Sequence, residues 1–134
     1  MGAWGAGSFE NDTALDWVWA LEESSDLRLV EEAIWDVLHC GDDLDADVGS
    51  VGLAAAEVTA ALRGKPVAGL PEEVAEWVGN YRNDPGDTLV ADCLAAVDRI
   101  RNDDASELKE LWEEDDELAP AWHSVLDDLA TRLQ

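Results

Sequence analysis

Apolar residues recur along most of this chain at the spacing of an α-helix, and this periodicity limits the fold more than any other feature. Between residues 27 and 38 they fall at positions i, i+3, i+7, i+10 and i+11, which places Leu27, Val30, Ile34, Val37 and Leu38 in one stripe. Alternating β-branched runs, which are typical of strands, are absent from the sequence. The pattern predicts an all-α protein with one domain over residues 1–134, built as a bundle or orthogonal array of six to seven short helices.

Capping and turn residues set the expected limits of these helices. The first is expected over about residues 12–21, with a cap at Asn11 or Asp12, or a capping box of Thr13 and Asp16. A second follows residues 24–26 and ends before Gly41. An alanine-rich helix over 50–63 is expected near the centre of the packing. Further helices are expected over about 71–81 and 87–101, through Leu108, Leu111 and Trp112, and over about 120–133. A cap at Asp104 is expected for the sixth of these seven.

The first 21 residues, MGAWGAGSFENDTALDWVWAL, combine aromatic side chains with three glycines. Ordering glycine costs more backbone entropy than ordering other residues, so three of them close together favour a shaped turn over a loose tail. Trp and Phe side chains need a surface to pack against. We therefore expect an ordered N-terminal lead-in over residues 3–10, with Trp4 and Phe9 largely buried against the helices.

The chain is strongly acidic. It has 32 acidic and 8 basic residues, a formal net charge of −24 at pH 7, and the acidic residues are spread over both halves of the chain. Such a field repels nucleic-acid phosphate and anionic lipid, so we expect no nucleic-acid or membrane partner. It favours a basic protein partner, or it serves only solubility. Salt-adapted and high-GC bacterial proteomes share this composition.

Motifs for cofactors, metals or catalysis are weak. The stretch GDDLDADVG (residues 41–49), expected to be a loop, places Asp43, Asp45 and Asp47 like the first three ligands of an EF-hand, but Val48 and Ala54 occupy the positions that need Gly and Glu. The two cysteines and two histidines match no zinc spacing. Two cysteines outside a CxxC pair suit a reducing cytoplasm. We expect no metal site and no cofactor.

Glu57 stands out within the alanine-rich helix. It falls at the flank of a core face centred on Ala54, Val58 and Ala61. A half-buried carboxylate needs a partner, which leaves two alternatives: a structural pair with an arginine, or an acid in a functional pocket. The candidate partners for the Glu57 carboxylate are Arg28, Arg63, Arg82, Arg99 and Arg101.

A second acidic group surrounds the start of the first helix. Glu10, Asn11, Asp12 and Asp16 lie where a helix dipole favours carboxylates, so capping is the simpler interpretation. Asp12 and Asp16 share a helix face at i, i+4, which mildly destabilises the helix. A cation or a basic side chain bound there is the alternative.

Most of the seven tryptophans lie at helical spacing and are expected in the core. Trp19 and Trp35 are the exceptions, because Trp35 lies beside the apolar stripe of its helix. An exposed tryptophan is a common interface anchor, and burial of either one in a homodimer is one alternative.

The opening MGAWG-x-G-x-FENDTA-x-DW resembles that of a family of small bacterial proteins classed only as a domain of unknown function. The stretches LAAAEVTAALRG (53–64), SELKELW (106–112) and DLATRL (128–133) resemble the same family, so the similarity covers nearly the whole chain. It implies a bacterial, stand-alone, cytoplasmic helical domain, and it implies no activity. The matching positions in the opening are Trp4, Gly5, Gly7, Phe9, Glu10, Asn11, Asp12, Ala14, Asp16 and Trp17.

These observations lead to one favoured function and one alternative. The favoured function is a non-enzymatic interaction module, immunity- or antitoxin-like or an adaptor, that engages a basic partner. The alternative is a small metal-dependent hydrolase that uses the N-terminal acidic cluster. The candidate binding residues are Trp4, Phe9, Glu10, Asn11, Asp12, Asp16, Trp17 and Glu57; no catalytic residue is proposed.

Overall fold

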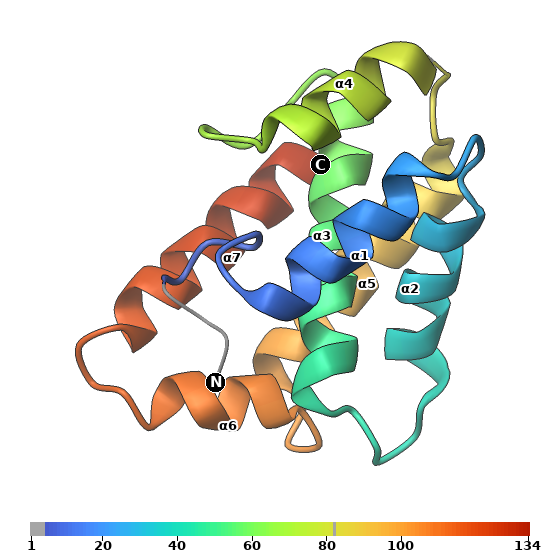
Figure 1. Ribbon diagram of the computed structural model, residues 1–134. Helices are drawn as coiled ribbons and strands as arrows, with labels where there is room; N and C mark the ends of the chain where they lie inside the picture. Colours follow the sequence, from blue (N-terminus) through green and yellow to red (C-terminus); the bar gives the residue numbers. More distant parts are fainter. Residues whose placement is uncertain (1–4, 82) are drawn as a thin grey trace.

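The computed structural model describes residues 5–81 and 83–134, and in these ranges the chain forms seven helices and no strand (Figure 1). The helices are α1 (Asp12–Glu22), α2 (Arg28–His39), α3 (Ala46–Leu62), α4 (Glu72–Tyr81), α5 (Asp87–Asn102), α6 (Glu107–Glu113) and α7 (Ala119–Leu133). The expected all-α, single-domain architecture is confirmed. Within the described ranges no helix has the length and apolar character needed to cross a membrane.

Helix α3 runs through the middle of the molecule and contacts all six other helices (Figure 1). Its residues are buried almost without interruption from Gly49 to Ala61. A helix that is surrounded on every side needs small or apolar side chains around its whole circumference, and the alanine-rich composition of α3 meets this need. The central position predicted for this helix is confirmed.

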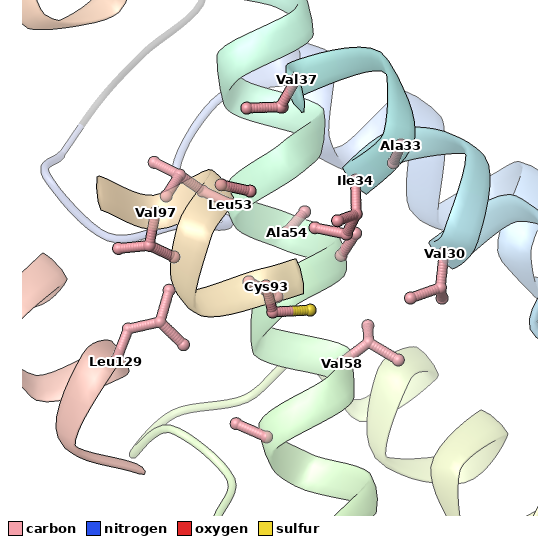
Figure 2. Close-up of a cluster of buried hydrophobic side chains, with 14 of the residues drawn as sticks. Val30, Ala33, Ile34, Val37, Leu53, Ala54, Val58, Cys93, Val97 and Leu129 are labelled. Atoms are coloured by element: carbon pink, nitrogen blue, oxygen red, sulfur yellow. The ribbon is translucent and has the colours of Figure 1, made fainter. Parts of the chain in front are cut away.

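Close approach between α3 and its neighbours forms the core. Figure 2 shows side chains of α2, α3, α5 and α7 converging around α3, among them Ile34, Ala54 and Val97. Gly52 marks the closest approach, because a Cβ atom there would lie 2.5 Å from Cγ2 of Val37. Glycine at this position therefore allows α2 to pack this closely against α3.

The start of α3 differs from the sequence prediction. The acidic stretch was expected to remain a loop as far as residue 49, but α3 begins at Ala46. The side chain of Asp45 caps the helix by accepting the N–H of Val48 at 2.9 Å. The N–H of Ala46 donates to Oε1 of Glu107, at the start of α6, at 2.8 Å. Local capping and a distant carboxylate together extend the helix by about one turn.

Other helix ends follow from local chemistry. The side chain of Asn11 caps α1 by accepting the N–H of Ala14 at 2.8 Å. This confirms Asn11 among the predicted alternatives for the cap. Gly41 adopts the positive φ of 64° that ends α2. The prediction of Asp104 as the cap of α6 is wrong: Ser106 is the N-cap, and its hydroxyl accepts the N–H of Lys109.

Candidate functional site

The N-terminal segment before α1 is held in a tight turn. Ser8 and Phe9 are buried, so the prediction for Phe9 is confirmed, whereas Trp4 lies outside the described residues. The carboxylate of Glu10 turns back over the segment and accepts the N–H of Gly7 at 3.0 Å. A Cβ on Gly5 or Gly7 would lie 2.3 Å or 2.4 Å from a carboxylate oxygen of Glu10. Glycine at these two positions makes room for that carboxylate.

Glu57 ties this segment to the centre of the molecule. It is fully buried in α3, where its Oε2 accepts the hydroxyl of Ser8 at 2.8 Å and its Oε1 lies 2.9 Å from Nη1 of Arg132 on α7. The structural Arg–Glu pair, one of the two predicted alternatives, is therefore present. The expected set of arginine partners is wrong, because Arg132 near the end of the chain was not among them.

Arg132 remains charged in this environment. Its side chain is only 13% exposed, and burial by itself disfavours the charged form. Hydrogen bonds and Coulombic attraction from Glu57 and from Asp128, whose Oδ2 lies 2.8 Å from Nε of Arg132, outweigh burial and raise the pKa of Arg132. A charged arginine at this position neutralises the buried carboxylate of α3.

The acidic residues at the start of α1 do not join Glu57 in one site. Asn11 is occupied as the N-cap, Glu10 is turned towards Gly7, and Asp12 and Asp16 are exposed on α1. Trp17 is half-buried and packs against the core. Over residues 5–81 and 83–134 there is no group of three or more His, Cys, Asp or Glu side chains that could hold a metal ion. Asn11 therefore acts as a cap, and Asp12 is the acidic residue in the first turn of α1, where the helix dipole favours it.

An open groove of about 310 Å³ lies elsewhere, between α2 and the start of α5. Glu31, Trp35 and His39 follow one edge of α2 at i, i+4 and i+8, and Thr88 and Asp92 follow the facing edge of α5. Trp35 is 59% exposed, whereas Ile34 and Leu89, which also line the groove, are buried. The groove therefore combines an apolar floor with an exposed aromatic ring and two carboxylates.

Trp35 is held in a defined orientation. Its indole stacks on the imidazole of His39, with 4.3 Å between ring centroids and 18° between ring planes. Nδ1 of His39 lies 3.0 Å from the backbone oxygen of Trp35 and fixes the imidazole in turn. An aromatic ring that is already ordered loses little conformational entropy when a partner packs against it.

Sequence reasoning found part of this groove. The exposure predicted for Trp19 and Trp35 is confirmed, at 68% and 59%. His39 and Asp92 were missed as members of a site. The i, i+4 spacing of Glu31, Trp35 and His39 on the outer edge of α2 was a usable signal, but nothing in the sequence pairs that edge with α5.

The fold and this groove define a small, acidic, helical domain with an exposed tryptophan beside a surface groove. The chain belongs to the family described as "Domain of unknown function (DUF4259)", which it matches over residues 2–125. This confirms the kind of family that the sequence resemblance indicated. Neither a curated protein nor a solved structure matches the chain.

Proposed function

We propose that this protein is a non-enzymatic interaction module that binds a basic segment of a partner protein in the groove between α2 and α5. The observation that carries this proposal is the exposed, pre-ordered indole of Trp35 between the carboxylates of Glu31 and Asp92. An immunity- or antitoxin-like protein or an adaptor, in the cytoplasm of a bacterium as the resemblance implies, fits this role.

The charge and the shape of the groove both favour a basic segment. The described residues that line the groove include two carboxylates and no Lys or Arg, and the whole chain carries a net charge of −24. A lysine or arginine side chain can lie over Trp35 and gain about 0.5–2 kcal/mol from the cation–π interaction. Its charged end can reach Glu31 or Asp92, and the negative field of the protein accelerates the encounter.

The test measures the binding of a labelled peptide of alternating lysine and leucine by fluorescence polarisation at physiological ionic strength. Trp35→Ala removes the proposed anchor. Trp19→Ala is the matched control, because Trp19 is also an exposed tryptophan and does not line the groove. We expect Trp35→Ala to weaken binding about tenfold or more, as loss of an interface hot spot does, and Trp19→Ala to leave it unchanged.

Two results would contradict the proposal. Equal binding of the peptide by both variants would show that the general negative charge, and not the groove, holds it. A wild-type dimer that dissociates in the Trp35→Ala variant, measured by light scattering, would show that a second copy of the chain covers the groove. Melting curves of both variants check that the fold is intact.

A further inference from the structure

A cavity of about 180 Å³ lies where the N-terminal segment, the starts of α1 and α3, and helices α6 and α7 meet. It is separate from the groove beside Trp35 and shares no lining residue with it. Three stretches that are distant in sequence, residues 6–13, 46–53 and 108–122, contribute to its walls, so it exists only in the folded domain. Its lining combines polar groups with aromatic and aliphatic side chains.

The polar lining includes hydrogen-bond acceptors on Ser8, Thr13 and Asp47, and the side-chain amide of Asn11, whose oxygen caps α1, adds a donor. The hydroxyl of Ser8 donates its hydrogen to Glu57, and the hydroxyl of Thr13 donates its hydrogen to Oδ1 of Asp47 at 3.2 Å. A hydroxyl that has given away its hydrogen can only accept from a ligand. Asp47 is exposed at the rim and adds a carboxylate, which also only accepts when ionised. A ligand that donates hydrogen bonds and carries positive charge matches these three acceptors.

The apolar part of the lining is formed by Trp112, Trp122 and aliphatic side chains. Trp112 is half-buried and stacks nearly parallel on the buried Trp122, with 6.4 Å between ring centroids and 12° between ring planes. Leu53 and Leu108 also line the cavity. An apolar cavity of about 150 Å³ is sufficient for benzene, so the volume here suits a body of phenyl size with one additional small group.

We propose that this cavity is a binding site for a small organic cation, namely a primary amine attached to an apolar body about the size of a phenyl ring. The ammonium group donates to the carboxylate of Asp47 and to the lone pairs of Thr13 or Ser8. The apolar body lies against Trp112 and Leu53, where the aromatic face also attracts the positive charge. This site is independent of the peptide groove and of the function proposed for it.

The experiment uses the full chain and four probes. Benzylamine has the proposed chemistry, benzyl alcohol lacks the charge, benzoate reverses it, and methylammonium keeps the charge without the apolar body. Binding is measured by calorimetry and by the rise of the melting temperature that a native-state ligand produces. We expect benzylamine to bind at least tenfold more tightly than methylammonium or benzyl alcohol, and benzoate not to bind.

Variants assign the binding to this cavity. Asp47→Asn removes the proposed charge partner and should weaken benzylamine about tenfold while leaving benzyl alcohol unchanged. Asp42→Asn is the matched control, because Asp42 is an exposed acid in the same acidic stretch that does not line the cavity. Trp112→Ala should weaken the binding of benzylamine and of benzyl alcohol. Trp112→Phe keeps an aromatic ring at this position and should retain most of the binding. It provides the comparison if Trp112→Ala is poorly folded.

Three results would overturn the proposed binding site. Equal affinity for benzylamine and methylammonium would overturn the proposal, because it would show a response to net charge alone. Equal losses in the Asp42→Asn and Asp47→Asn variants would overturn it for the same reason. Unchanged binding of benzylamine in both Trp112 variants would place the ligand elsewhere on the protein.

Discussion

At the scale of the residue, Glu57 shows how this acidic chain keeps one carboxylate inside its core. The carboxylate is fully buried, but Arg132 supplies the opposite charge and Ser8 a hydrogen bond. Removing one partner of a buried ion pair is costly, since the other charge is left in a medium that solvates it poorly. The pair also fixes the N-terminal segment on α3 through Ser8. Glu57 therefore has a structural role that follows from its contacts with Arg132 and Ser8.

We predict that Glu57→Gln lowers the free energy of unfolding by about 3 kcal/mol, because Arg132 loses its buried counter-charge while side-chain volume is kept. Ser8→Ala, which removes one hydrogen bond to the same carboxylate, should cost only about 1–2 kcal/mol. Urea unfolding of the two variants measures both values. If Glu57→Gln lowered the free energy of unfolding by less than Ser8→Ala does, this account of the ion pair would be contradicted.

Asp103 gives a prediction for the dependence of stability on pH. The N–H of Ala105 at 2.8 Å and the guanidinium of Arg99 at 3.1 Å hold the pKa of Asp103 below its usual value. A group whose pKa is lowered by folding stabilises the native state above its unfolded pKa, which is about 3.9 for Asp. We expect Asp103→Asn to be less stable than the wild type at pH 7. This difference should shrink as the pH falls below about 4, and urea unfolding at several pH values measures it.

At the scale of the element, the packing of α3 against α2 depends on a glycine. A Cβ at Gly52 would meet the branched side chain of Val37 at 2.5 Å, and Ile100 lies on the same side at 3.3 Å. We predict that Gly52→Ala destabilises the protein by about 1–3 kcal/mol through overpacking, although alanine is the better helix former.

Gly79 in α4 provides the matched control for this prediction. A Cβ there would meet no atom within 4 Å beyond its chain neighbours and the adjacent backbone of α4, so we expect helix propensity to dominate the effect. Gly79→Ala should stabilise the protein by up to about 1 kcal/mol. Thermal and urea unfolding compare the two variants. The same sign of effect at both positions would show that propensity, and not the contact between α2 and α3, controls the outcome at Gly52.

The elements also show how far the sequence determines what is observed. The caps at Asn11 and Gly41 were predictable because they depend on neighbours within a few residues. The start of α3 was not, since the N–H of Ala46 is satisfied by Glu107, 61 residues further along. The partner of Glu57 and the meeting of α2 and α5 in a groove were missed for the same reason. Periodicity predicts which face of a helix is buried, but not which helix lies opposite.

At the scale of the whole molecule, like charges dominate the electrostatics. With 32 acidic and 8 basic residues, most carboxylates have no basic partner. The exposed pairs that do form, such as Arg63 with Asp87 at 3.2 Å, contribute at most about 1 kcal/mol each. Folding brings the remaining carboxylates closer together than they are in the unfolded chain, so their repulsion lowers the stability of the native state.

We therefore predict that the melting temperature at pH 7 rises between very low salt and about 0.15 M NaCl, where charges more than about 8 Å apart are screened. The control is the same titration near the calculated isoelectric point of about 4.1. Most of the net charge is gone there, so the added salt should have little effect. A melting temperature that falls with added salt at pH 7 would show that attraction within the ion pairs outweighs repulsion among the unpaired carboxylates.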